Sequence, residues 1–164
     1  DYLAMIERKT AALIARSLEI GALLGSDDAH VVRAFARFGR HLGLAFQIRD
    51  DLLGIWGDPA VTGKPAASDI RRRKKTFPIV FALERAGGPA REALARLYQA
   101  EAIDEAGVAA VRNLLEEVGA RQQTARAAAE HASSALAELD RLVLSPWARR
   151  SLEEVARFLA ERGF

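Results

Sequence analysis

Two adjacent aspartates, Asp50 and Asp51, are the residues of this sequence best suited to chemistry. Steps of three and four residues place them on one face of a predicted helix together with Gln47 and Gly54. Apolar neighbours on the other sides of this helix indicate that the charges face an interior cavity, where buried carboxylates need a cation. Mg²⁺ commonly binds one or two carboxylates together with waters and substrate phosphate oxygens. The pair therefore predicts a magnesium site.

The lysines supply a second kind of charge near this pair. Only four of the 24 basic residues are lysines, and all fall in the first half of the chain: Lys9, Lys64, Lys74 and Lys75. The compact charge of Lys suits a phosphate pocket with little room, whereas Arg presents a wide planar fork. Because the formal net charge is only +2, anion binding must be local rather than the effect of a global cationic field.

Composition excludes several classes of protein. The chain has no cysteine, which excludes disulfides, thiolate catalysis and cysteine-bound metals. No apolar stretch approaches the roughly 20 residues of a membrane span, and no signal peptide opens the chain. We therefore expect a cytoplasmic protein. The basic run 71–75 is short and lacks stacking aromatics, so we expect no nucleic-acid binding.

Apolar residues recur at spacings of three and four throughout, which predicts an all-α fold in a single domain, 1–164. The expected helices are 2–24, 28–56, one from the N-cap Thr76 to Arg85, 89–100, 104–118, 120–143 and one beginning at Ser145-Pro146. Residues 57–75 form the one long irregular segment, and loops of this length are usually functional or mobile. The chain begins with Asp1 inside a predicted helix, which suggests a fragment.

The helix 28–56 carries both an apolar stripe and a row of glycines. The stripe predicted to be buried is Val31, Phe35, Phe38, Leu42, Ala45 and Leu52. Glycines at 39, 43 and 54 lie on the face of the aspartates, which indicates either space for a ligand or a close helix crossing. The isolated histidines, His30, His41 and His131, are interpreted as surface or packing residues rather than metal ligands. Trp56 and Trp147 are expected in the core.

Several motifs together resemble the second aspartate-rich region of the trans-isoprenyl diphosphate synthases, the polyprenyl synthetase family. They are Lys9-Thr10-Ala11, Phe38-Gly39 through Leu42-Gly43, Phe46 to Asp58 with its Asp50-Asp51 pair, Thr62-Gly63-Lys64-Pro65, and Asp69 and Lys74 followed by Thr76-Phe77-Pro78. The motifs agree with the family in order and spacing. Residues beyond about Gly87 match only as generic helices.

The resemblance implies the C-terminal portion of the isoprenoid synthase fold, a helical bundle. It implies a Mg²⁺-dependent transferase that condenses an allylic prenyl diphosphate with isopentenyl diphosphate, and a homodimer in the full-length protein. By the same resemblance, Asp50 and Asp51 would ligate or orient Mg²⁺. Lys9, Lys64 and Lys74 would bind the diphosphate, and Thr10 and Gln47 would place their oxygens near the allylic cation.

Two departures from the family pattern shape the expectations. The motif often reads Asp-Asp-x-x-Asp, but its fifth position here is Gly54. The family's first aspartate-rich motif is absent from these 164 residues, so we expect the fragment alone to be inactive and to expose apolar surface. Two alternatives stay open: a non-catalytic or regulatory helical subunit of a heteromeric synthase, and a terpene cyclase-like protein.

Overall fold

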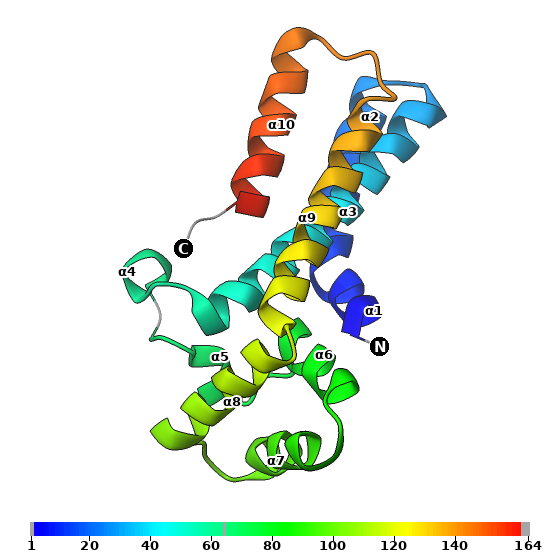
Figure 1. The fold of residues 1–164 in the computed structure, drawn as a ribbon. Helices are drawn as coiled ribbons and strands as arrows, with labels where there is room; N and C mark the ends of the chain where they lie inside the picture. Colours follow the sequence, from blue (N-terminus) through cyan, green and yellow to red (C-terminus); the bar gives the residue numbers. More distant parts are fainter. Residues whose placement is uncertain (1, 64, 162–164) are drawn as a thin grey trace. The chain divides into compact units, whose positions relative to one another are not determined.

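A computed structural model describes residues 2–63 and 65–161, and its described residues form helices and connecting turns with no strand (Figure 1). This confirms the all-α prediction. The elements are α1 (Tyr2–Ile6), a π-helical turn η1 (Glu7–Ala11), α2 (Ala12–Gly25), α3 (Ala29–Trp56), α4 (Pro59–Thr62), α5 (Ser68–Arg71), α6 (Phe77–Arg85), α7 (Gly88–Gln99), α8 (Glu105–Glu117), α9 (Ala120–Leu139) and α10 (Pro146–Glu161).

Most predicted boundaries lie within a residue or two of these, with three differences. The segment of the expected first helix is helical throughout, but its α-helical geometry is interrupted by the π-helical turn η1. The expected helix 120–143 ends earlier, at Leu139. The irregular segment 57–75 contains the short helices α4 and α5, and α4 begins where the Asp58 side chain accepts a hydrogen bond from the backbone N–H of Ala60 at 2.8 Å.

The chain divides into two compact units, one formed by residues up to Arg49 together with those from Ala127 onward, the other by Asp50–Arg126. The first unit contains α1, η1, α2, α10 and the larger parts of α3 and α9. Its core gathers Phe38, Leu42, Ala135, Leu139 and Ala156, with Ile14, Leu18 and Leu152 packed against them. Of the stripe predicted to be buried, Val31 and Phe35 are only half-buried. The other four members are buried, as the period of 3.6 residues predicts: Phe38, Leu42, Ala45 and Leu52.

The second unit has its own core, built by the end of α3 with α5, α6, α7 and α8. Its fully buried side chains include Leu52, Ile55, Ile70, Ile79, Leu94 and Leu115. Trp56 belongs to this core, as predicted, with 8% of its surface exposed. The prediction that Trp147 is buried is wrong, because this side chain on α10 is 73% exposed.

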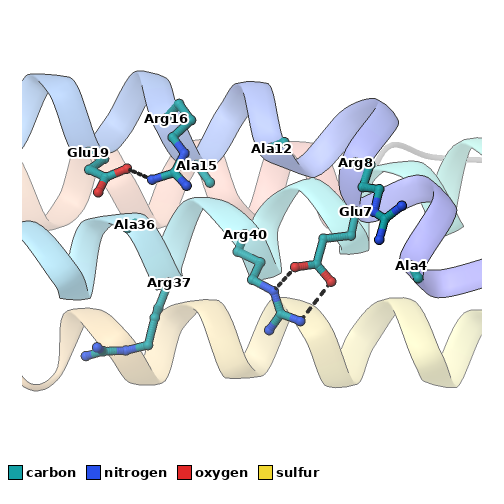
Figure 2. Close-up of a pocket in the computed structure, with 10 residues that line it drawn as sticks. All are labelled: Ala4, Glu7, Arg8, Ala12, Ala15, Arg16, Glu19, Ala36, Arg37 and Arg40. Carbon is teal, nitrogen blue, oxygen red and sulfur yellow. Dashed lines mark hydrogen bonds and ion pairs between the residues drawn. The ribbon is translucent and has the colours of Figure 1, made fainter.

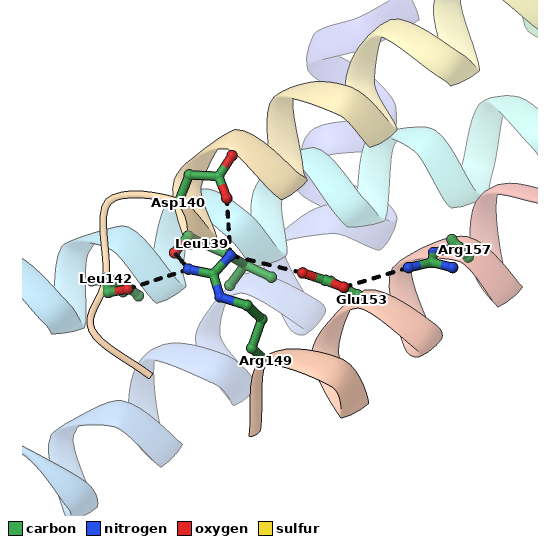
Figure 3. Close-up of polar contacts among 6 residues, drawn as sticks. All are labelled: Leu139, Asp140, Leu142, Arg149, Glu153 and Arg157. Carbon is green, nitrogen blue, oxygen red and sulfur yellow. Dashed lines mark hydrogen bonds and ion pairs between the residues drawn. The ribbon is translucent and has the colours of Figure 1, made fainter. Parts of the chain in front are cut away.

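Arg149, in the first turn of α10, closes the end of α9 (Figure 3). Its guanidinium donates to the carbonyl oxygen of Leu139 at 2.9 Å and pairs with Asp140 at 2.9 Å and Glu153 at 3.7 Å. The last carbonyls of a helix have no partner within it and carry partial negative charge, so a cation stabilises them. This contact fixes the turn between α9 and α10, where Ser145 caps α10 by accepting a hydrogen bond from the N–H of Ala148.

Large apolar side chains remain exposed on the first unit. They include Leu13, Ile20, Leu23 and Leu24 on α2 and Trp147, Val155 and Phe158 on α10. The expectation that this chain exposes apolar surface is therefore confirmed for these helices. Within the described residues, no helix is both long and apolar enough to cross a membrane.

His41 on α3 and His131 on α9 meet inside the first unit, with their Nδ1 atoms 3.2 Å apart. Burial, followed by the charge of Arg40, lowers the pKa of His41. Burial, followed by His41 and Arg40, lowers the pKa of His131, while Glu130 acts in the opposite direction. The neutral pair is thus favoured in the fold, in agreement with the packing interpretation.

Because the folded state disfavours protonation of this pair, its contribution to stability is complete above the unfolded pKa of about 6.5 and is lost as the pH falls below it. We therefore measure the denaturant concentration at the unfolding midpoint between about pH 7 and about pH 5.5. As the pH falls, we expect this midpoint to decrease more steeply in the wild type than in His131→Asn. His30→Asn, at an exposed histidine, is the control and should follow the wild type. Equal slopes for all three proteins would contradict this account.

Candidate functional site

The two predicted metal ligands differ in their surroundings. Asp50 is half-buried, whereas Asp51 is only 4% exposed. Asp51 Oδ2 accepts a hydrogen bond from the backbone N–H of Phe77 at 2.9 Å, at the first residue of α6. Thr76, the predicted N-cap of α6, makes no capping bond, and its hydroxyl is buried without a hydrogen-bond partner. Asp51 therefore takes the capping role from another helix.

Removing this cap should destabilise the protein whether or not Asp51 takes part in catalysis. We expect Asp51→Ala to lower the free energy of unfolding by about 1–2 kcal/mol, the usual loss at an N-cap. Asp51→Asn keeps a side-chain oxygen that can accept from the N–H of Phe77, so it should retain most of that stability. Chemical denaturation measures both. A loss in Asp51→Asn equal to that in Asp51→Ala would show that the charge, and not the cap, matters.

Lys74 is held by a buried carboxylate of the same unit. Its Nζ lies 2.6 Å from Asp69 Oδ1, and the Lys74 side chain is 44% exposed while that of Asp69 is 4% exposed. Burial, and then the negative charge of Asp69, raises the pKa of Tyr98 above its usual range. The site therefore combines a buried carboxylate, Asp69, with a lysine side chain that reaches the surface.

Asp69 belongs to the segment that resembles the family, but nothing in the sequence assigned it a role, so sequence reasoning missed this residue. The sequence shows a cluster of charged residues from Asp69 to Lys74, but it does not show which of them is buried. Two arginines of the same basic run are also engaged, since Arg71 pairs with Glu105 and Arg73 donates to the carbonyl of Ala100. Lys64, predicted to bind diphosphate, lies outside the described residues.

Thr10 and Gln47 are brought together in the first unit. The Thr10 hydroxyl donates to Gln47 Oε1 at 2.8 Å. Thr10 and the exposed Lys9 both lie on η1, where the N–H of Ala12 reaches back five residues to the carbonyl of Glu7. Single π-helical turns of this kind occur frequently at functional sites. The pairing agrees with the predicted joint role of Thr10 and Gln47, which stays a prediction.

The glycines of α3 serve close packing, which decides between the two interpretations given above. A Cβ atom at Gly43 would lie 2.5 Å from the Cα of Ala11, and one at Gly39 would lie 2.7 Å from the Cα of Ala15. A Cβ atom at Gly54 would lie 2.6 Å from Asp69 Cγ. Space kept for a ligand is therefore the wrong explanation at all three positions, because protein atoms already fill it.

Gly43 and Gly21 give a matched test of this packing. Both lie in helices, where Gly→Ala normally stabilises by roughly 0.5–1 kcal/mol. No atom lies within 4 Å of a Cβ at Gly21, so Gly21→Ala should raise the melting temperature. We expect Gly43→Ala to lower it instead, because the new methyl group forces η1 away from α3. Stabilisation by both substitutions would disprove the close crossing.

The chemistry of the donor set fits Mg²⁺ only as a partial coordination sphere. Within the described residues, no group of three or more His, Cys, Asp or Glu side chains is placed to hold a metal. Asp50 and Asp51 supply carboxylate oxygens at neighbouring positions, and Mg²⁺ usually keeps several waters and takes substrate phosphates in addition. The described residues therefore suit a metal bound together with a phosphate ligand better than a metal held by protein alone.

A separate groove lies on the first unit, between α1, η1 and α2 on one side and α3 on the other (Figure 2). It has a volume of about 430 Å³ and is lined by alanines, arginines and glutamates. Arg40 donates to both carboxylate oxygens of Glu7, at 2.6 and 2.9 Å, and this holds the pKa of Glu7 below its usual value. None of the predicted site residues lines the groove.

A family model described as polyprenyl synthetase matches residues 1–117. The chain belongs to the polyprenyl synthetase family. The match confirms the resemblance drawn from the motifs and extends it past Gly87, where sequence reasoning saw only generic helices.

The relatives support the same assignment. The chain is 39% identical to a (2E,6E)-farnesyl diphosphate synthase of Mycobacterium bovis, over 99% of its own length and 46% of the relative's. A crystal structure of a polyprenyl synthetase from Streptomyces coelicolor A3(2) is similar with a TM-score of 0.88 and 41% identity, over 96% of this chain and 48% of that one.

A third relative was crystallised with ligands. The geranylgeranyl pyrophosphate synthase of Corynebacterium glutamicum, complexed with isoprenyl diphosphate and magnesium, is similar with a TM-score of 0.85 and 35% identity, over 94% of this chain and 44% of that one. The chain thus spans about half the length of the relatives it matches. Its helices are those of the isoprenyl synthase fold, which confirms the predicted fold class.

Proposed function

We propose that this chain contributes the second aspartate-rich part of a Mg²⁺-dependent trans-prenyltransferase, which joins an allylic prenyl diphosphate to isopentenyl diphosphate. The observation that carries the proposal is the placement of Asp50 and Asp51 on α3, one helical turn before Gly54. Asp69 packs against Gly54 and forms an ion pair with Lys74. Carboxylates and an ammonium group in one small region suit a metal–diphosphate complex.

The proposed roles differ from residue to residue. In the second unit, Asp50 would hold the metal, Asp51 would orient that turn of α3 through its bond to Phe77, and Lys74, together with Lys64, would bind diphosphate oxygens. In the first unit, Lys9 would add a further cation, and the Thr10–Gln47 pair would place oxygen lone pairs toward developing positive charge. The roles follow from the family, and the exposure of Lys9 and Lys74 and the half-burial of Asp50 support them.

The reaction needs charge stabilisation more than acid–base groups. The bond between carbon and oxygen breaks, its electron pair leaves with the diphosphate, and the double bond of isopentenyl diphosphate forms the new carbon–carbon bond. A proton then leaves the new chain, and the departed diphosphate can accept it. Bound Mg²⁺ would neutralise the leaving diphosphate. Lys74 and Lys9 would add preorganised positive charge, the kind of electrostatic term that usually contributes most to catalysis.

The farnesyl and geranylgeranyl names of the relatives describe those proteins. For the protein that contains this chain, we propose a soluble cytoplasmic enzyme in the form of a homodimer. We propose that other protein segments pack against the exposed apolar side chains of α2 and α10. Residues 1–164 contain no first aspartate-rich motif. We therefore propose that they do not catalyse the condensation on their own.

The proposal is tested by assaying the intact protein with labelled isopentenyl diphosphate and allylic diphosphates of several lengths. We expect Mg²⁺-dependent product, and a fall in kcat of about 10²–10³-fold in Asp50→Asn, comparable with the loss of one preorganised electrostatic contact. Glu84→Gln, at an exposed carboxylate of α6, is the control and should leave the rate unchanged.

The same assay separates the alternatives. An inactive intact protein that becomes active only with a second prenyl synthase subunit would favour a regulatory subunit. A cyclised hydrocarbon formed from a single allylic diphosphate would favour a terpene cyclase. Full activity in Asp50→Asn would remove the role given to the aspartates.

A further inference from the structure

Asp69 is among the most buried charged residues that the structure describes. It lies on α5 with 3% of its surface exposed, and its carboxylate lies 2.6 Å from the ammonium group of Lys74. A carboxylate removed from water is stable as an ion only when it is paired and hydrogen-bonded. The two ends of this pair differ, because the Lys74 side chain keeps 44% of its exposure. One end is fixed in the protein and the other reaches solvent.

The backbone holds Lys74 to the same residue. The N–H of Lys74 donates to the carbonyl oxygen of Asp69 at 2.9 Å. The turn that permits this contact runs through Arg73 with a φ of 51°, and Ala67 before α5 has a φ of 53°. Both values lie in the left-handed region, which non-glycine residues adopt at some cost in energy. Main chain and side chain of Asp69 therefore both fix Lys74.

Gly54 is what allows Asp69 to lie where it does. A Cβ atom at position 54 would lie 2.6 Å from Asp69 Cγ, closer than any two such atoms can approach. Asp69 thus packs on the bare backbone of α3, one turn after Asp50 and Asp51. The motif lacks a carboxylate at its fifth position, Gly54, and the carboxylate of Asp69 from α5 lies there instead. This carboxylate forms an ion pair with Lys74.

We propose that Asp69 is a positioning residue for diphosphate binding. It holds the Lys74 ammonium group beside the turn of α3 that bears Asp50 and Asp51. The absence of a side chain at Gly54 leaves room for Asp69 to do so. The role rests on the proposed function. An ammonium group has three N–H donors, so the bond to Asp69 leaves donors for phosphate oxygens. A side chain already held in place loses less conformational freedom when the ligand binds.

Asp69 also opposes anion binding through its own negative charge, so the sign of its net effect is informative. If positioning dominates, removing the charge weakens diphosphate binding. If repulsion dominates, removing it strengthens binding. The burial of Asp69 on the protein side of Lys74 favours positioning, because the carboxylate stays behind the ammonium group as seen from solvent.

The test is a double-mutant cycle on the intact protein, with inorganic pyrophosphate and Mg²⁺ as the probe and isothermal titration calorimetry as the readout. We expect Asp69→Asn and Lys74→Gln each to weaken binding about tenfold, which matches the loss of one hydrogen bond to a charged group. In the Lys74→Gln background, Asp69→Asn should change binding by less than about twofold, because coupled residues are not additive. Lys75→Gln, at the exposed neighbour, is the matched control and should bind like the wild type.

Three results would overturn the role of Asp69. They are an equal loss from Asp69→Asn in both backgrounds, tighter binding in Asp69→Asn, and unchanged binding in Asp69→Asn. A wild type that binds no pyrophosphate at all is a different outcome, because it removes the proposed function itself and this role with it.

Gly54→Ala tests the proposal without removing either charge, and it serves if Asp69→Asn fails to fold. The added methyl group must displace Asp69 and loosen Lys74, so we expect pyrophosphate binding about fivefold to tenfold weaker. Thermal melting is measured in parallel, because alanine normally stabilises a helix interior. Folded Gly54→Ala protein with wild-type affinity would contradict the proposal.

Discussion

Close approach to the bare backbone of α3 is the constraint on which the other contacts depend. Gly43 lets η1 come near enough for Thr10 to bond Gln47, and Gly54 lets Asp69 pack where a side chain would otherwise stand. Each glycine weakens the helix by roughly 1 kcal/mol relative to alanine. The burial of Phe38, Leu42 and Leu52 on the same helix offsets that loss. The helix therefore depends on tertiary packing rather than on its own propensity.

The sequence predicted most of the fold because its helices are amphipathic and their ends carry ordinary signals. Pro78, Pro89 and Pro146 mark first turns correctly. The π-helical turn η1 left no such signal, because it differs from an α-helix by one hydrogen-bond step and its residues have no distinct composition. Trp147 was misplaced for another reason: a large apolar residue can lie on either face of a helix at a chain turn, and only the packing decides.

The candidate site was predictable in its residue types but not in its connections. Adjacent aspartates and rare lysines identify the region, since both types are chemically suited to metal and phosphate. Spacing along the chain could not show that Asp51 caps α6, or that Asp69 lies against Gly54, because both contacts join elements that are far apart in the sequence. Such contacts depend on how α3, α5 and α6 pack, which periodicity does not determine.

These contacts divide the acidic residues by task. Asp51 is buried, and one of its oxygens accepts a hydrogen bond from the N-terminus of α6. It therefore stabilises the fold and fixes the rotation of the turn that bears Asp50. Asp69 is equally buried, and its charge is matched by Lys74. Asp50 alone of the three is half-buried, and a metal that keeps waters and phosphate ligands needs an accessible oxygen. Burial therefore separates Asp50, which stays half-buried, from Asp51 and Asp69, whose carboxylates make contacts within the fold.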